Sequence, residues 1–118
     1  FMKNDKLSIQ SMDFAVSIIE LVKSLKEKRE SIISNQIGRS GTSIGANIRE
    51  AQYAHGKADF IAKLFISLKE AGETEYWLEL LYESGYIDEE RFDVLYSKNK
   101  ELIRIITSII KTTKNNNC

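Results

Sequence analysis

The chain of 118 residues contains no proline, so the strongest interruption of a helix is missing from it. Only six glycines are present, and loop-rich β folds depend on both residue types for their turns. Apolar residues recur at three- and four-residue spacings through most of the chain, and no strand-like alternation competes with that helical period. The sequence therefore predicts an all-α protein.

Four periodic segments each predict one helix. They cover about residues 7–25, 31–53, 60–84 and 88–114. Gly85 is the type of residue that closes a helix, and Asp88 is a candidate N-cap for the last one. Short connections favour an antiparallel up-down-up-down four-helix bundle. We expect a single domain over residues 7–114, with flexible termini at 1–6 and 115–118.

Charge and composition exclude several classes of protein. Seventeen Lys and Arg balance seventeen Asp and Glu, which counts against a polybasic coat for nucleic acid or membranes. Hydrophobic residues make up 42% of the chain, too many for a disordered protein, and charges interrupt them too evenly for a membrane span. The zero total conceals an acidic stretch over 57–94 and a basic one over 95–118, and such patches can help subunits to dock.

Cysteine and histidine are too scarce for a metal centre or a cofactor site. Cys118 is the only cysteine, so no disulfide can form within the chain, and a cytoplasmic location is expected. His55 is the only histidine and has no Glu-x-x-His partner of the kind that di-metal bundles use. Nor does the pattern pair a nucleophile with a base, so we expect no catalytic residues, no metal and no cofactor.

Polar residues follow the second segment on a side that isoleucines flank. At helical spacing they form one stripe: Gln36, Ser40, Ser43, Asn47 and Glu50. In the third segment Glu75 falls among core leucines, and an unpaired buried carboxylate costs several kcal/mol. We therefore expect Glu75 to meet Asn47, Ser43 or Arg39. The predicted buried polar network is Gln36, Arg39, Ser43, Asn47, Glu50 and Glu75; it either fixes helix register or forms a small-ligand or enzyme site.

Glycines and a second apolar face predict self-association. Three glycines in the second helix cost it about 3 kcal/mol relative to alanine, which a close packing groove would offset. The third helix carries an apolar face away from its core stripe, and an isolated bundle would expose Trp77 there. The first helix, in contrast, is interpreted as having one broad apolar stripe. The predicted oligomer interface is Gly38, Gly41, Gly45, Ile66, Trp77, Leu80 and Leu81.

An ordered set of residues resembles a known family. The set is Gln36-Ile37-x-Arg39-Ser40-x-x-Ser43-Ile44-x-x-Asn47-Ile48-x-Glu50-Ala51, Asp59-Phe60, Ser67-Leu68-Lys69-Glu70-Ala71-x-Glu73-Thr74-x-Tyr76-Trp77-Leu78 and Gly85-Tyr86-Ile87. It is similar to the four-helix bundle proteins encoded in 23S rRNA intervening sequences, over essentially the whole domain. That resemblance implies a bacterial protein, commonly a homopentamer, without established enzymatic activity. Relatives in diversity-generating retroelements imply a basic surface for RNA and a reverse transcriptase.

The leading functional hypothesis is a non-catalytic homo-oligomer, with a pentamer favoured, that engages structured RNA or an RNA-associated protein. Phosphate contacts would come from exposed basic residues. The candidates are Lys26, Lys28, Arg29, Arg49, Arg104, Lys111 and Lys114. The charged run 26–30 has a simpler interpretation as a solvated helix end and turn. A protein-interaction adaptor and a ligand or enzyme site in the polar network stay open as alternatives.

Overall fold

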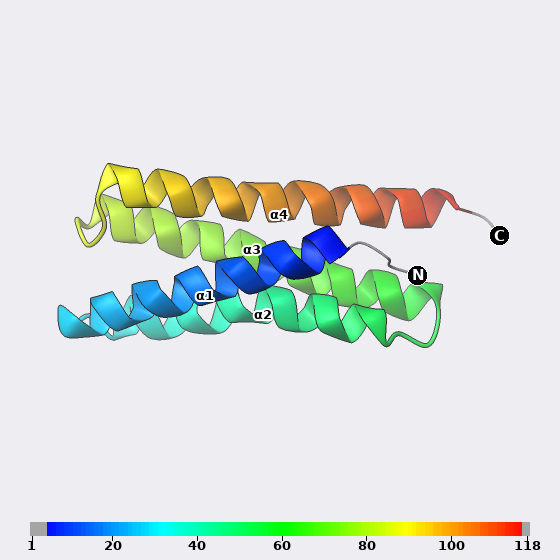
Figure 1. Cartoon of the computed structure of the whole chain (residues 1–118), viewed down its shortest axis with the longest axis horizontal. Helices are drawn as coiled ribbons and strands as arrows, with labels where there is room; N and C mark the ends of the chain where they lie inside the picture. Colours follow the sequence, from blue (N-terminus) through cyan, green and yellow to red (C-terminus); the bar gives the residue numbers. More distant parts are fainter. Residues whose placement is uncertain (1–4, 117–118) are drawn as a thin grey trace.

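The computed structural model describes residues 5–116 and contains four α-helices in them. These are α1 (Asp5–Glu27), α2 (Ile32–Gln52), α3 (Lys57–Glu83) and α4 (Glu89–Asn115). They run up, down, up and down along a rod with extents of 51 × 21 × 20 Å (Figure 1). The predicted all-α four-helix bundle is confirmed. Residues 5, 6 and 115, which we expected in flexible termini, are helical, and residues 1–4 and 117–118 lie outside the described range.

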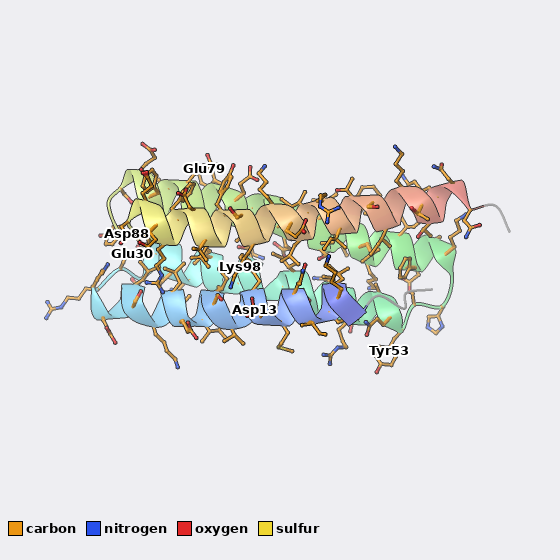
Figure 2. All side chains as sticks on the ribbon, turned by 45° about the horizontal axis from the view of Figure 1, so that its top comes forward. Asp13, Glu30, Tyr53, Glu79, Asp88 and Lys98 are labelled. Carbon is orange, nitrogen blue, oxygen red and sulfur yellow. The ribbon has the colours of Figure 1, made fainter. Side chains whose placement is uncertain are left out.

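Each helix contacts two of the other three. Over the described residues α1 lies beside α2 and α4, α3 lies beside α2 and α4, and the backbones of the diagonal pairs do not approach closely. The four helices therefore stand at the corners of a square. The seam between α2 and α3 is the most extensive and the seam between α1 and α4 the least. Along that thin seam Lys98 of α4 reaches Asp13 of α1 at 3.0 Å (Figure 2).

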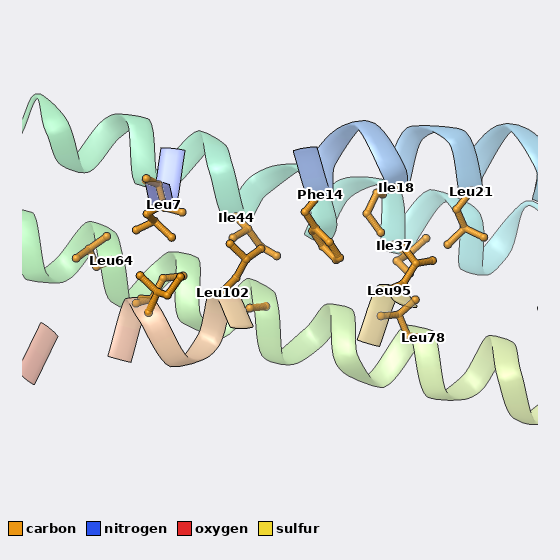
Figure 3. Close-up of a cluster of buried hydrophobic side chains, with 14 of the residues drawn as sticks. Leu7, Phe14, Ile18, Leu21, Ile37, Ile44, Leu64, Leu78, Leu95 and Leu102 are labelled. Atoms are coloured by element: carbon orange, nitrogen blue, oxygen red, sulfur yellow. The ribbon is translucent and has the colours of Figure 1, made fainter. Parts of the chain in front are cut away.

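The core runs along the axis of the square. One residue in every three or four of each helix is fully or almost fully buried, and Figure 3 shows these side chains meeting between the helices. The α1 members are Leu7, Phe14, Ile18, Leu21 and Leu25. Each such side chain contributes about 1.5–3 kcal/mol through burial. None of the described helices combines the length and the apolar composition that a membrane span needs.

Two of the turns use the same left-handed residue after a helix. Gly85 has φ of 82° after α3, as its position in the sequence predicts, and Arg29 has φ of 63° after α1. In both turns the next amide donates to a carbonyl five residues back at 2.9 Å, which closes the helix end. The predicted N-cap of α4 is also confirmed, because Asp88 Oδ1 accepts from the Arg91 amide at 2.8 Å.

The glycines of α2 face α1 of the same chain. A Cβ added to Gly41 would lie 2.8 Å from Cγ1 of Ile18, so α1 approaches closer there than any side chain allows. A Cβ added to Gly38 would lie 3.3 Å from Cγ2 of Val22, and one added to Gly45 would lie 3.3 Å from Oγ of Ser11. These glycines do form a groove for a neighbouring helix, but that helix is α1. Their predicted place in an oligomer interface is corrected accordingly.

Candidate functional site

The predicted buried polar network does not assemble on α2. Gln36, Arg39 and Glu50 are exposed. Ser43 donates to the Arg39 carbonyl at 2.7 Å and Asn47 to the Ser43 carbonyl at 2.9 Å, so both bond the backbone of their own helix. The buried stripe of α2 is instead Ser34, Ile37, Ser40, Gly41, Ile44, Ile48 and Ala51. Small polar residues and a glycine therefore form the buried side, and the larger polar side chains face outward.

Glu75 faces α4 rather than α2. Its carboxylate forms an ion pair with Lys100 Nζ at 2.7 Å, and its side chain is partly exposed. The hydrogen bond to this carboxylate holds the pKa of Lys100 above its ordinary value. The predicted contacts of Glu75 with Asn47, Ser43 or Arg39 are therefore wrong. Its position at the edge of the α3–α4 seam lets it stay charged without the cost of full burial.

A different set of polar residues is fully buried between the helices. Each uses a short side chain to bond across a seam, so the bonds tie neighbouring helices together at fixed heights. The bonds are Ser40 to Thr74 hydroxyl at 2.8 Å, Ser67 to the Ile44 carbonyl at 2.8 Å, and Asn99 to the Ala71 carbonyl at 2.9 Å. These bonds hold the register of neighbouring helices, and they involve none of the residues of the predicted network.

An ion-pair cluster lies on the surface where α2 meets α3. Arg39 pairs with Glu70 at 3.0 Å and also with Glu73. The Trp77 indole donates to Glu73 Oε2 at 3.0 Å. The indole and the guanidinium together hold the pKa of Glu73 below its ordinary value, and the two carboxylates raise the pKa of Arg39. Ile66 lies beside this cluster in a shallow hollow.

Replacing Trp77 with phenylalanine is expected to raise the pKa of Glu73, because the carboxylate loses the indole hydrogen bond that lowers this pKa most. The stabilisation linked to Glu73 is present above its unfolded pKa and is lost as the pH falls through its lowered folded pKa. A carboxyl carbon NMR titration measures the change. Tyr76→Phe is the matched control, since Tyr76 packs edge-on against Trp77 at 5.0 Å. Equal Glu73 titration in both variants would contradict the assignment.

The predicted RNA contacts separate into two groups at opposite ends of the rod. Lys26, Lys28 and Arg29 lie at the turn between α1 and α2. Lys26 donates to Asn35 at 3.0 Å, and Lys28 donates to the Tyr86 carbonyl at 2.9 Å. These two lysines therefore help to hold the turns at their end of the bundle. A single continuous surface built from all seven predicted residues does not form.

The other basic group lies where α2 ends, α3 begins and α4 ends. Arg49 and Lys111 are exposed there. Lys114 Nζ stands 4.9 Å from the centre of the Phe65 ring, so its charge covers an aromatic face. Arg104, another predicted contact, pairs with Glu101 on its own helix.

The exposed apolar residues differ from those predicted. Leu81 is fully buried in the core, so its predicted interface role is wrong, and Trp77 and Leu80 are half-buried. Ile66 is exposed, and its place in an oligomer interface stays a prediction. The more extensive apolar surface lies on α1, where four side chains are about half exposed or more. They are Ile9 at 67%, Met12 at 55%, Val16 at 49% and Ile19 at 47%.

The α1 surface was missed because the first segment has two apolar stripes rather than one broad stripe. The inner stripe packs on the core, and the outer one repeats at spacings of three, four and three residues. Beside the outer stripe a hollow of about 470 Å³ runs between α1 and α2. Its floor and walls include Met12, Ala15, Ile19, Thr42, Gly45 and Ala46. The spacing of the outer stripe, which can be read from the sequence, was the signal that could have identified this surface.

The described residues contain no group of three or more His, Cys, Asp or Glu that could hold a metal ion. The fold and these surfaces define a small antiparallel four-helix bundle whose exposed features are apolar stripes and ion pairs. The chain belongs to the 23S rRNA-intervening sequence protein family, whose family model matches residues 3–108. The resemblance noted in the sequence is thereby confirmed.

A solved structure from Bacteroides thetaiotaomicron is similar to this chain. It is described as a protein with unknown function from the S23 ribosomal protein family. The two chains are 52% identical with a TM-score of 0.88, and the match covers 89% of this chain and 98% of that one. Comparison with curated proteins gives no match. Neither description names a catalytic activity.

Proposed function

We propose that the protein is a non-catalytic homo-oligomeric scaffold of the bacterial cytoplasm, with a pentamer as the favoured assembly. The observation that carries this proposal is the outer stripe of α1, four large aliphatic side chains that the bundle leaves in water. Covering apolar surface gains about 25 cal/mol per Å², and contiguous exposed patches mark interaction sites. The polar residues predicted to form a ligand site are dispersed over the bundle, which favours a function that depends on contacts at the protein surface.

Structured RNA is the partner that the basic end of the bundle favours. Arg49, Lys111 and Lys114 provide charge for phosphates. Tyr53 at the same end is 79% exposed and lies at the tip of the rod (Figure 2), where its ring is available for a base to stack. An RNA-associated protein would instead contact this end through its own acidic groups. The zero net charge limits binding to this local patch.

Native mass spectrometry of the full chain from a bacterial host, with and without nuclease, tests both parts. We expect one pentameric species and additional mass that nuclease removes. A monomer would contradict the scaffold, and additional mass that resists nuclease would support the adaptor alternative. An oligomer that carries no RNA and binds none at low salt would contradict the RNA part alone.

Charge reversal identifies the RNA surface. Lys111→Glu with Lys114→Glu is expected to weaken binding of a structured RNA at least tenfold in a filter assay at low salt. Lys26→Glu with Lys28→Glu makes the same change in net charge at the opposite end and serves as the control. Equal loss in both double variants would indicate general electrostatic attraction rather than a site.

A further inference from the structure

Two incompletely covered apolar surfaces lie on neighbouring sides of the square bundle. We call the first the α1–α2 face; it consists of Ile9, Met12, Val16 and Ile19 with the hollow beside them. The second, the α2–α3 face, consists of Ile66 and Trp77 with the Arg39, Glu70 and Glu73 cluster. Both faces include α2, because α2 is the corner helix that they share. One chain therefore carries two different surfaces, each lacking a partner.

The lower parts of the two faces lie at one height along the rod. Ser11 packs against Gly45, where an added Cβ would lie 3.3 Å from the Ser11 hydroxyl, and the residue before Gly45 accepts the 2.8 Å hydrogen bond from Ser67. α1, α2 and α3 are thus level at this point. Met12 follows Ser11 and Ile66 precedes Ser67, so an exposed methionine and an exposed isoleucine lie at the same level on adjacent faces.

The upper parts match in the same way. Ile18 packs against Gly41, and the residue before Gly41 bonds Thr74 at 2.8 Å, which sets α1 and α3 level again. Ile19 is the next residue on α1, and Trp77 lies less than one helical turn beyond Thr74. Both apolar pairs would therefore meet if two copies stood side by side without sliding along the axis.

The directions of the two faces determine the symmetry. In a square bundle adjacent faces meet at roughly a right angle. When one face of each copy docks on a different face of its neighbour, every copy is rotated by the same angle relative to the one before it. The copies close into a ring when that angle divides a full turn into a whole number of steps. An angle of 90° closes a ring of four copies, and a narrower angle of 72° closes a ring of five. A contact between identical faces would stop at a dimer.

We propose that the α1–α2 face of one copy docks on the α2–α3 face of the next, with Met12 beside Ile66 and Ile19 beside Trp77. This inference rests on the homo-oligomer of the proposed function and adds which surfaces meet. The occupant is a second copy because this chain itself supplies the matching apolar side chains, Ile66 and Trp77, at the heights of Met12 and Ile19.

Cysteine crosslinking tests the pairing in the full chain carrying Cys118→Ser. With Met12→Cys and Ile66→Cys in the same chain, a short bismaleimide is expected to produce a ladder of covalent oligomers on a denaturing gel. Met12→Cys alone is expected to give no crosslink, and a mixture of the two single variants is expected to give dimers only. Met12→Cys with Val94→Cys is the control, since Val94 is 50% exposed on α4, outside both faces.

The outcomes separate this inference from the proposed function. An oligomer by native mass spectrometry that yields no ladder, or that crosslinks through Met12→Cys alone, overturns the pairing and leaves the homo-oligomer standing. A monomer overturns both. As a second variant, Met12→Glu is expected to weaken assembly at least tenfold with an unchanged helical circular dichroism spectrum, whereas Val94→Glu is expected to leave assembly intact. Equal assembly of the two glutamate variants would also overturn the pairing.

Discussion

Replacing Gly41 with alanine is expected to lower the free energy of unfolding by about 2 kcal/mol, since an atom forced into a packed seam costs about 1–3 kcal/mol. The new Cβ would lie 2.8 Å from Cγ1 and 3.0 Å from Cγ2 of Ile18. Ile18 is fully buried and β-branched, so its side chain has little freedom to rotate away in a helix. The α1 backbone would have to move.

Gly72 provides a matched control for that experiment. It lies inside α3, is exposed, and an added Cβ would meet nothing within 4 Å. Gly72→Ala is therefore expected to raise the free energy of unfolding by about 0.5–1 kcal/mol, the ordinary gain of alanine over glycine in a helix. Urea unfolding followed by circular dichroism measures both variants. Changes of the same sign would contradict the close α1–α2 contact.

Glu30→Ala is expected to cost about 2 kcal/mol, because the first turn of α2 loses its side-chain acceptors. Only 7% of Glu30 is exposed. Its carboxylate accepts from the Ile33 amide at 3.0 Å and from the Ser34 amide at 2.7 Å, and its carbonyl accepts from the Ser34 hydroxyl at 3.0 Å. The residue at the helix boundary, Ser31, makes no such bond with its side chain.

Two further variants isolate the capping role of Glu30. Glu30→Gln keeps one acceptor oxygen and is expected to lose about half as much stability as the alanine variant. Glu27→Ala removes an exposed carboxylate near the same turn and is expected to have little effect. Thermal and urea unfolding measure all three variants. If Glu30→Ala is as stable as Glu27→Ala, the two hydrogen bonds of the Glu30 carboxylate contribute no net stability.

The parts of the fold that depend on local rules could be predicted from the sequence. A glycine after a helical segment and an aspartate before one identified the ends around Gly85 and Asp88, and both residues do what their chemistry requires. The four helices followed from the spacing of apolar residues, and the short connections left one simple arrangement. Even the packing role of the α2 glycines was correct, although their neighbour is in the same chain.

The rotation of α2 about its own axis could not be predicted. Serine and glycine are found on both buried and exposed helix faces, so a stripe of them gives a weak signal against a stripe of glutamine, asparagine and glutamate. Ser40 and Ser67 are buried because each bonds across a seam, which depends on the height of the neighbouring helix. Glu30 was assigned to solvent because its acceptor role depends on the turn closed by Arg29.

The thin seam between α1 and α4 has a consequence for how the chain folds. These are the first and last helices, and the seam between them is the least extensive of the four, with Lys98 and Asp13 paired at its surface. The middle hairpin of α2 and α3 has the most extensive contact, and a connection of four residues joins its helices, so it closes at low entropic cost. During synthesis this hairpin can form before α4 leaves the ribosome, and α1 can add to it through the glycine seam.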